Sequence, residues 1–254
     1  MITLSSDFGS PYPAAMKGVI LQRTDARLVD VSHEFPQQDV RSAAFWLREV
    51  LPYFPPAVHC IVVDPGVGTD RAAVVVRVGA HALVAPDNGV ALPAARALAG
   101  EGDVIEVFDI EVDDPDSATF HGRDVFAPMA ATVHETGVDS IQSVDHLVRA
   151  DAYEDVTFPR ATVSETGASG EVLVVDDFGN AITNIPGDAI VDRFGGQIHI
   201  NAEPAPVRRT YAAVDPGQRL VTVGSHGNVE LAVNRGRGDD AFRLDVGDRV
   251  ELTA

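Results

Sequence analysis

The segment from residue 62 to 71 has an acidic and a cationic side chain on either side of a tight turn. Asp64 and Arg71 are seven residues apart, with Pro-Gly-Val-Gly at 65–68 between them. A turn of this composition can bring the guanidinium of Arg71 back over the carboxylate of Asp64. An aspartate paired in this way stays ionised and oriented, so it can hold a water molecule. The alternative is a structural ion pair that braces a loop.

His121 adds an imidazole, and it lies directly before a predicted helix. Gly122, which follows it, permits close approach of a ligand or an unusual backbone conformation. Asp124 suits the positive end of the helix dipole. The alternative is a surface or capping histidine. Together, Asp64, Arg71 and His121 would supply a carboxylate, a guanidinium and an imidazole, which are enough to position and polarise one water.

Asp7 follows the first predicted strand, in the sequence Ser-Asp-Phe-Gly at 6–9. Open α/β sheets bind ligands at the carboxyl ends of their strands, where a carboxylate can accept two hydrogen bonds from a ribose diol. The alternative is a turn or N-cap aspartate. The chain contains neither GxGxxG nor a Walker A sequence, so phosphate binding is not indicated. Asp7, Asp64 and His121 could also be metal ligands, but no HxH or HExxH spacing supports this, and no metal is predicted.

A fourth group of candidates lies in the second half of the chain, in Asp-Asp-Phe-Gly-Asn at 176–180. Such a sequence ordinarily forms a hairpin turn. Phenylalanine is unusual in a turn unless its ring covers something, so the ring of Phe178 and the amide of Asn180 could hold a planar base. Further polar residues occur at 183–184 and at 225–228.

These candidates need elements to position them, and the first half of the chain alternates strand-like and helix-like segments. This alternation predicts an α/β layer architecture. The predicted strands are 2–5, 27–31, 58–63 and 104–108, with a hairpin of 72–78 and 81–85 around Gly79-Ala80. The predicted helices are 13–23, 39–51 and 124–134.

The second half changes character. The strands predicted there are short and separated by Gly, Asn and Asp, at 170–175, 181–185, 197–200, 219–223, 229–233 and 249–252. This pattern predicts a small all-β barrel-like domain. We therefore expect an N-terminal catalytic domain at 1–150, a linker at 151–164 and a C-terminal domain at 165–254.

The sequence is strongly acidic and poor in lysine. Its formal net charge is −19, and Lys17 is the one lysine among 19 basic residues. Nucleic acid is therefore not expected as a partner, because phosphate binding needs a basic surface. Screening by salt removes the self-repulsion of such a charge, which predicts a high-salt cytosol and a haloarchaeal source. The alternative is an ordinary acidic protein.

Cysteine content and hydropathy limit the cellular compartments that fit this protein. Cys60 is the one cysteine, which excludes a disulfide framework and predicts an inert, buried thiol in a reducing cytoplasm. No apolar run is long enough for a membrane span, and residues 1–5 predict a strand rather than a signal peptide.

Taken in order, the motifs of this chain resemble the S-adenosyl-L-methionine (SAM) hydroxide adenosyltransferase family, or SAM hydrolases, whose superfamily contains the bacterial fluorinase and chlorinase. Each motif is weak alone, but their joint order over nearly the whole chain is specific. The matching segments are 6–9, 15–18, 38–41, 63–68, 85–89, 119–124, 176–180, 183–185 and 224–225.

The resemblance implies a Rossmann-like α/β domain, a C-terminal β-barrel-like domain and a homotrimer with its sites between subunits. It implies hydrolysis of SAM to adenosine and L-methionine, without a cofactor, and identifies Asp64, Arg71 and His121 as catalytic. The substrate-binding residues that it implies are Asp7 on the ribose hydroxyls, Phe178, Asn180 and Val233 around adenine, and Asp176, Ser225 and His226 at the methionine end. Phe8 and Gly122 are further substrate-binding candidates.

Two departures and two alternatives accompany this resemblance. The family usually has an additional Asp in the first glycine turn, which is shortened here to Gly-Ser-Pro-Tyr at 9–12, and Ser10 or Tyr12 is a candidate substitute. Position 226 is His where halogenating relatives have Arg. Halogenation is the first alternative, but those relatives have Tyr at the position of Asp64, and a carboxylate repels a halide. The second alternative is a SAM- or adenosine-binding sensor without turnover.

Overall fold

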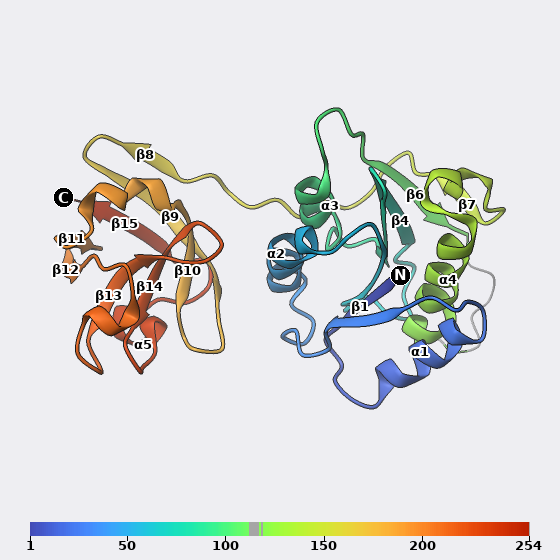
Figure 1. Ribbon diagram of the computed structural model, residues 1–254, viewed down its shortest axis with the longest axis horizontal. Helices are drawn as coiled ribbons and strands as arrows, with labels where there is room; N and C mark the ends of the chain where they lie inside the picture. Colours follow the sequence, from blue (N-terminus) through green and yellow to red (C-terminus); the bar gives the residue numbers. More distant parts are fainter. Residues whose placement is uncertain (112–116, 118, 254) are drawn as a thin grey trace. The chain divides into compact units, whose positions relative to one another are not determined.

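A computed structural model describes residues 1–111, 117 and 119–253 (Figure 1). The chain divides into two compact units, Met1–Thr157 and Phe158–Ala254. The division falls inside the segment 151–164 that the sequence predicts as a linker. The residues just before it are attached to the first unit, because Arg96 Nη2 lies 2.5 Å from Asp155 Oδ2 and the Asp87 carboxylate accepts from Glu154 N.

The first unit is built on a mixed sheet with the strand order β2-β1-β3-β5-β4-β6-β7. Its strands are β1 (Ile2–Ser6), β2 (Leu28–Ser32), β3 (Val58–Val62), β4 (Ala73–Val78), β5 (His81–Pro86), β6 (Glu106–Ile110) and β7 (Leu147–Arg149). The neighbours from β2 to β5 pair in parallel, and β4, β6 and β7 pair antiparallel. The predicted α/β class and the hairpin around Gly79-Ala80 are therefore confirmed.

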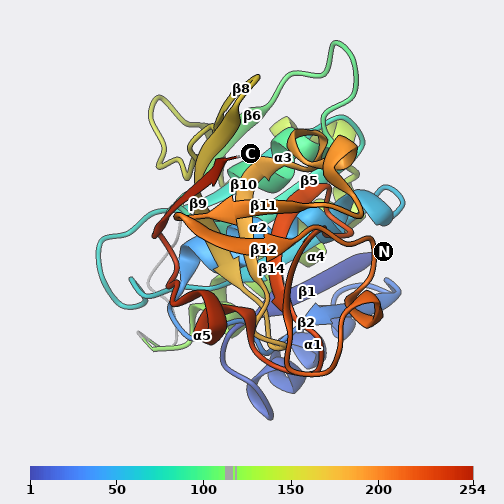
Figure 2. The same ribbon diagram turned by 90° about the vertical axis from the view of Figure 1, so that its left-hand side faces the viewer.

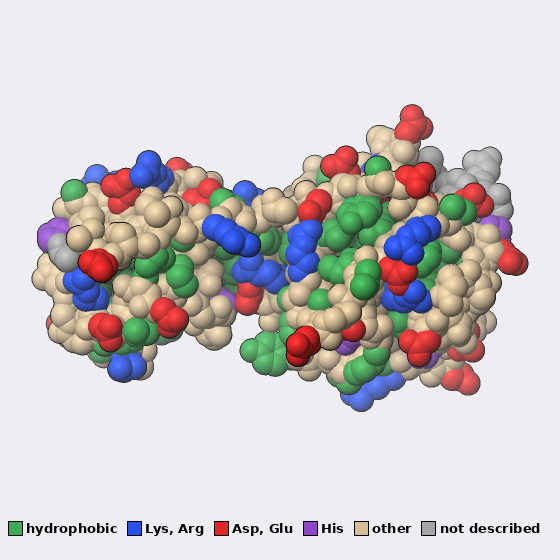
Figure 3. Space-filling view, turned by 90° about the horizontal axis from the view of Figure 1, so that it is seen from above, with side chains coloured by type: hydrophobic (Ala, Val, Ile, Leu, Met, Phe, Trp, Pro, Cys, Tyr) green, Lys and Arg blue, Asp and Glu red, His purple; other side chains and the backbone are tan. Residues whose placement is uncertain are grey.

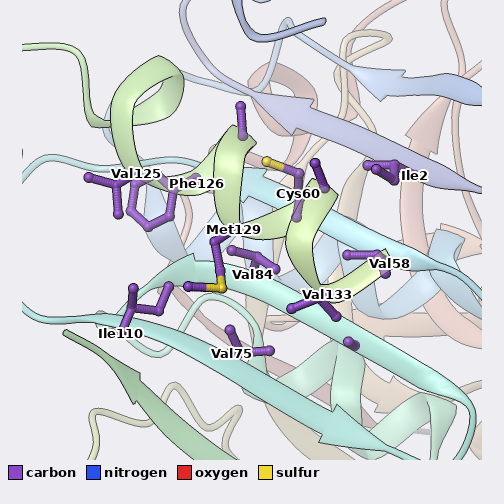
Figure 4. Close-up of a cluster of buried hydrophobic side chains, with 14 of the residues drawn as sticks. Ile2, Val58, Cys60, Val75, Val84, Ile110, Val125, Phe126, Met129 and Val133 are labelled. Atoms are coloured by element: carbon purple, nitrogen blue, oxygen red, sulfur yellow. The ribbon is translucent and has the colours of Figure 1, made fainter. Parts of the chain in front are cut away.

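Helices cover both faces of this sheet. They are α1 (Tyr12–Leu21), α2 (Val40–Val50), α3 (Leu92–Leu98) and α4 (Ala127–Thr136). Figure 1 shows α2 and α3 together on one side of the sheet, and α1 and α4 on the other. Figure 4 shows α4 over the sheet, with Met129 and Val133 facing Val84 and Val75. This dry interface fixes the ends of the central strands, from which the candidate site residues emerge.

The helix predicted at 124–134 begins earlier and less regularly than the sequence pattern indicates. Gly122–Phe126 forms a π-helical turn, and α4 continues from Ala127. Such turns insert an extra residue into the helical repeat and occur often at functional sites.

The second unit is an antiparallel sheet in the order β12-β11-β15-β9-β10-β14-β13, with β8 pairing on β9. Its elements are β8 (Thr162–Ser164), β9 (Gly167–Val175), β10 (Ala181–Pro186), β11 (Gln197–Ile200), β12 (Glu203–Pro206), β13 (Arg219–Val223), β14 (Asn228–Val233), α5 (Gly238–Phe242) and β15 (Arg249–Thr253). The edges nearly meet, because Val207 bridges Val221 and Arg208 N donates to Val221 O. Figure 2 shows strands of this sheet in face view, and the shape is nearly the predicted barrel.

Short 3-10 helices complete the two units. They are Leu51–Tyr53, Val138–Ser143, Gly187–Ala189, Val191–Arg193 and Tyr211–Ala213. Within the described residues, none of the helices combines the length and the apolar character that crossing a bilayer requires.

Candidate active site

Asp64 and Arg71 form a bidentate ion pair, which is the contact common to both interpretations of their sequence spacing. Asp64 lies two residues beyond β3, and Arg71 returns to it across a turn in which Asp64 O accepts from Val67 N. Arg71 Nε donates to Asp64 Oδ1 at 2.9 Å, and Nη2 donates to Oδ2. The two side chains are only 12% and 5% exposed for Arg71 and Asp64, so solvent screens this pair weakly.

The surroundings of Arg71 fix its orientation. Its guanidinium lies over the Phe126 ring, 5.4 Å from the centroid, and Nη1 donates to Ala72 O. A Cβ on Gly66 would lie 3.3 Å from Arg71 Cβ, so the turn passes close to the arginine stem. A delocalised guanidinium packed on a ring and held at both ends cannot readily swing away.

The carboxylate of Asp64 retains capacity for a further donor. Oδ1 accepts from Arg71 and from Gly66 N at 3.1 Å. Among the residues that the structure describes, Oδ2 accepts from Arg71 alone. A carboxylate oxygen has two lone-pair sites, so one site on Oδ2 is open to a water or a substrate.

His121 lies at the start of the π-helical turn that packs against the end of β3. A Cβ on Gly122 would meet Val62 at 3.4 Å, and Val62 is two residues before Asp64. Because Phe126 from the same turn lies under Arg71, the structure brings the His121 turn beside the ion pair. Within the described part of the chain, the half-buried ring of His121 makes no capping hydrogen bond to the helix. His121 thus occupies the N-cap position of this turn without capping it through its side chain.

Asp124 is a carboxylate of the same turn whose pKa is shifted by its neighbours Arg123 and His121. Arg123 donates to it through Nε at 2.5 Å and Nη2 at 2.8 Å. These hydrogen bonds, together with the charges of Arg123 and His121, hold the pKa of Asp124 below its usual value despite partial burial. His121 therefore lies within electrostatic reach of Asp124.

Asp7 and Phe8 lie just beyond β1, the strand that neighbours β3. Asp7 Oδ2 accepts from Gln38 N at 2.7 Å. The ring of Phe8 makes edge contacts with Tyr12 and Phe120, at centroid separations of 6.2 and 6.1 Å. Since Phe120 directly precedes His121, the loop with Asp7 and the turn with His121 are packed together.

The Asp176–Asn180 turn lies in the second unit, between β9 and β10. Asp176 Oδ1 accepts from Phe178 N and Asn180 N, and Oδ2 accepts from the Asn180 amide. Gly179 has a φ of +82°, and a Cβ there would lie 2.7 Å from Arg237 Cβ, so only glycine fits. The turn leaves Phe178 79% exposed, whereas Asn180 is buried. The predicted hairpin turn is confirmed, and the Asp176 carboxylate stabilises the backbone of this turn.

Ser225 and His226 lie in the turn before β14, and Val233 ends that strand. His226 Nδ1 accepts from Asn228 N at 3.4 Å, and its Nε2 lies 3.6 Å from Oε2 of the buried Glu230. The sequence analysis missed Glu230, which also accepts from Tyr211 OH at 2.5 Å.

Tyr211 connects this turn with the one containing Asp176. Burial, the hydrogen bond to Glu230 and the charges of Glu230 and Asp176 all raise the pKa of Tyr211. The two candidate turns of the second unit therefore lie near the same tyrosine.

The candidates thus form two groups, each within its own unit. The first contains Asp7, Phe8, Asp64, Arg71, His121 and Gly122, and the second contains Asp176, Phe178, Asn180, Ser225, His226 and Val233. In the described part of the chain, no three His, Cys, Asp or Glu side chains are grouped as a metal site would require.

A set of polar residues behind Asp7 also escaped the sequence analysis. His33 contacts Ser6 and Asp30, and Lys17 contacts Asp30. One signal could have found it: Asp30 and His33 lie at the carboxyl end of a predicted strand, like Asp7 and Asp64.

Comparisons with known proteins cover nearly the whole chain and point to one family. Residues 2–144 match the SAM hydroxide adenosyltransferase N-terminal domain, and residues 170–251 match the C-terminal domain of the same family. A protein of Salinispora tropica named (R)-S-adenosyl-L-methionine hydrolase is 38% identical over 100% of this chain and 97% of its own. A protein of Thermus thermophilus with the same name is 39% identical over 97% of each chain.

Two solved structures have the same fold. An uncharacterised conserved protein from Thermotoga maritima aligns over 100% of both chains with a TM-score of 0.83 and 33% identity. A conserved hypothetical protein from Thermus thermophilus aligns over 99% of this chain and 98% of its own, with a TM-score of 0.78 and 35% identity. With both domains matched in order and curated relatives at this identity, the chain belongs to the SAM hydroxide adenosyltransferase family.

Proposed function

We propose that this protein hydrolyses SAM to adenosine and L-methionine without a cofactor. The observation that carries the proposal is the Asp64–Arg71 pair, a nearly buried carboxylate held by two guanidinium contacts, with an open lone-pair site on Oδ2. The relatives named (R)-S-adenosyl-L-methionine hydrolase support it independently.

The reaction requires a correctly positioned water more than it requires acid catalysis. The leaving group at C5′ is a sulfonium, which departs as a neutral thioether and needs no proton. The reaction needs one water behind C5′, in line with the breaking C–S bond, and such positioning contributes up to about 7–11 kcal/mol. Asp64 orients this water and favours its hydroxide character, and Arg71 holds the Asp64 carboxylate in place. His121 hydrogen-bonds the same water or accepts its proton.

Substrate binding is divided between the two groups of residues. Asp7 accepts from the ribose hydroxyls, with Phe8 and Gly122 beside the sugar. In the second unit, Phe178, Asn180 and Val233 surround adenine, whereas Asp176, Ser225 and His226 hold the methionine end. Since Asp176 already accepts from its own turn, its remaining lone pairs receive the substrate ammonium.

The proposal extends to fold detail, assembly and location. The parallel strands, in the order β2-β1-β3-β5, form a Rossmann-like half sheet whose order reverses between β1 and β3, where such sheets bind ligands. Asp7 and Asp64 follow these two strands. The protein acts as a cytoplasmic homotrimer, in which the second group of residues comes from a neighbouring copy.

Product analysis tests the proposed reaction. Purified protein is incubated with SAM in molar KCl, and the products are separated by chromatography. We expect adenosine and methionine in equal amounts. 5′-Chloro-5′-deoxyadenosine would identify a halogenase instead, and unchanged SAM beside a bound adenosyl ligand would identify a sensor.

A further inference from the structure

A line of polar side chains runs behind Asp7, from the surface into the core of the first unit. Lys17 Nζ donates to Asp30 Oδ2 at 2.6 Å, Asp30 Oδ1 lies 3.1 Å from His33 Nε2, and His33 Nδ1 lies 2.7 Å from Ser6 Oγ. These residues come from α1, β2, the loop after β2, and the end of β1. The chain's one lysine is therefore at the outer end of this line, and the residue before Asp7 is at its inner end.

Charge and burial along this line favour one arrangement of protons. Burial alone would raise the pKa of Asp30, but its contacts with Lys17 and His33 outweigh burial and lower that pKa. An ionised Asp30 draws the imidazole proton to Nε2, although the contact is not aligned as a full hydrogen bond. Nδ1 is then the acceptor for the hydroxyl of Ser6, which is fully buried.

Backbone hydrogen bonds join the same two loops around Asp7. His33 O accepts from Gly9 N at 2.9 Å, and Ser6 O accepts from Phe35 N at 3.4 Å. Asp7 Oδ2 itself accepts from Gln38 N at 2.7 Å. The loop after β1, which contains Asp7, is therefore held by the loop after β2, and His33 contacts it through both its ring and its carbonyl.

A nucleophilic role for the Ser6–His33–Asp30 array does not fit this geometry. The serine hydroxyl is fully buried, so a substrate cannot reach it. The array ends instead at the backbone that presents Asp7. A role in positioning accounts for the burial, the contacts and the place of the array in the fold.

We propose that His33, supported by Asp30 and Lys17, is a positioning residue that orients the Asp7 carboxylate toward the ribose diol of the substrate. The inference rests on the proposed function, in which Asp7 accepts from the ribose hydroxyls. A carboxylate recognises a diol only if both hydroxyls find lone pairs in the correct direction. Loss of the His33 ring frees the Ser6–Asp7 backbone. Binding of the ribose diol is then weakened more than the other contacts with the substrate.

The test measures ribose recognition by itself. Calorimetry gives the affinity of the full-length protein for adenosine and for 2′-deoxyadenosine, and their ratio is the discrimination factor. We expect adenosine to bind at least about tenfold more tightly to the wild type, because a site built for a hydroxyl rejects the analogue that lacks it. Asp7→Ala removes this preference.

Three variants then decide the role of His33. His33→Ala is expected to lower the discrimination factor toward that of Asp7→Ala, and to raise KM for SAM with little change in kcat. His33→Asn keeps a polar atom near the Nδ1 position, where it can still contact Ser6, and is expected to retain most of the discrimination factor. His134→Ala, a half-buried histidine of α4, is the matched control and leaves it unchanged.

The outcomes separate this inference from the proposed function. If His33→Ala weakens both nucleosides by the same factor, or keeps the wild-type preference, the inference is wrong. If Asp7→Ala keeps that preference, Asp7 does not hold the ribose, and the inference is also wrong. If wild type shows the preference but does not hydrolyse SAM, the proposed function fails while the His33 comparison still decides the inference. Thermal melts identify a variant that has simply unfolded. Asp30→Asn, which removes the charge beside His33 Nε2, is then expected to lower the discrimination factor, and an unchanged factor would contradict the inference.

Discussion

At the scale of single residues, the proposed chemistry depends on how the Asp64 carboxylate is held. Asp64 is nearly buried, yet it is not isolated, because Arg71 approaches through two nitrogens and Gly66 N through a third contact. A buried charge without such partners would be strongly unfavourable. The open lone-pair site on Oδ2 therefore belongs to a carboxylate whose position is fixed by three donors.

Asp64→Asn tests this role directly. The amide keeps the shape but loses the charge and one acceptor, so it no longer favours hydroxide character in a bound water. We expect kcat for SAM to fall by about 10²-fold or more, with KM changed little. Steady-state kinetics measure both values. Asp70→Asn, in an exposed position of the same loop, is the control and should keep wild-type kinetics. A raised KM with normal kcat would assign Asp64 to binding instead.

His59 makes the stability of the first unit dependent on pH. It is fully buried between Thr3 Oγ1 at 2.8 Å and His81 Nδ1 at 3.0 Å. Burial, and secondarily the charge of His81, lower the pKa of His59 to about 3, and burial lowers that of His81 as well. The unfolded chain therefore binds more protons than the folded one below about pH 6.5, and folding is opposed there.

The expected result is a loss of stability as the pH falls from about 6.5 toward 3, with the buried His59 contributing up to about 1.4 kcal/mol per pH unit. Urea unfolding at several pH values measures it. His59→Leu should flatten this slope, whereas the exposed His146→Leu should not. A slope that is the same in both variants would show that other groups are responsible.

At the scale of elements, the site depends on how closely the π-helical turn packs against β3. Gly122 has Phe120 Cε2, Met16 Sδ and Val62 Cγ1 within 3.1–3.4 Å of where a Cβ would stand. A methyl group there must push the His121 turn away by a few tenths of an ångström. Since Phe126 of this turn also supports Arg71, the displacement would reach both His121 and Arg71.

Gly122→Ala is therefore expected to lower kcat by about tenfold, because small misplacement of reacting groups is costly, while unfolding free energy changes by less than about 2 kcal/mol. Kinetics and urea unfolding give the two values. Gly18→Ala in α1, where nothing lies within 4 Å of the added carbon, is the control and should leave kcat unchanged. Unchanged kcat in Gly122→Ala would contradict the account.

The elements that the sequence predicted well are those in which one physical signal dominates. Apolar strands β1 and β3 and the amphipathic α2, capped by Asp39, are at the predicted positions. The missed elements have conflicting signals. β12 contains two prolines, which a strand tolerates because it is at the edge of its sheet. The seven-residue α3 is too short for a clear periodicity and is stabilised by packing on α2.

The site could be predicted in part for a similar reason. Asp64 and Arg71 are close in sequence, so a turn signal was sufficient to predict their contact. His33 and Ser6 are 27 residues apart, and Tyr211 and Glu230 are 19 apart. Such contacts depend on how strands align in the sheet, which composition and periodicity do not reveal.

At the scale of the whole molecule, the net charge of −19 is the dominant property. On the face shown in Figure 3, acidic and basic side chains are interspersed on both units, consistent with local ion pairs such as Arg219–Glu203 and Arg249–Glu251. Salt weakens such exposed pairs, but each contributes little, whereas the self-repulsion of the excess charge extends over the whole surface.

We therefore expect the melting temperature to rise as KCl increases from about 0.1 to 1 M, over which range the screening length falls from about 10 to 3 Å. Differential scanning calorimetry measures this, and sucrose at matched osmolality is the control for general solvent effects. A melting temperature that is constant or falls would contradict adaptation to a high-salt cytosol.

The proposed trimer predicts complementation between inactive variants. Asp64→Asn disables the first group of residues, and Asp176→Asn weakens the second. If each site combines groups from two copies, trimers assembled from an equal mixture have about a quarter of their sites intact. Activity at low SAM should then recover to that level after co-refolding, with light scattering confirming the trimer. Mixed trimers without recovered activity would place both groups in the same copy.

The central claim is that a water held by Asp64, Arg71 and His121 attacks C5′ of the substrate. The most direct test is hydrolysis of SAM in ¹⁸O-labelled water, followed by mass spectrometry of both products. The account predicts one labelled oxygen in the 5′-hydroxyl of adenosine and unlabelled methionine. Label in methionine, or adenosine formed without label, would show that the bond from C5′ to sulfur is not broken by water.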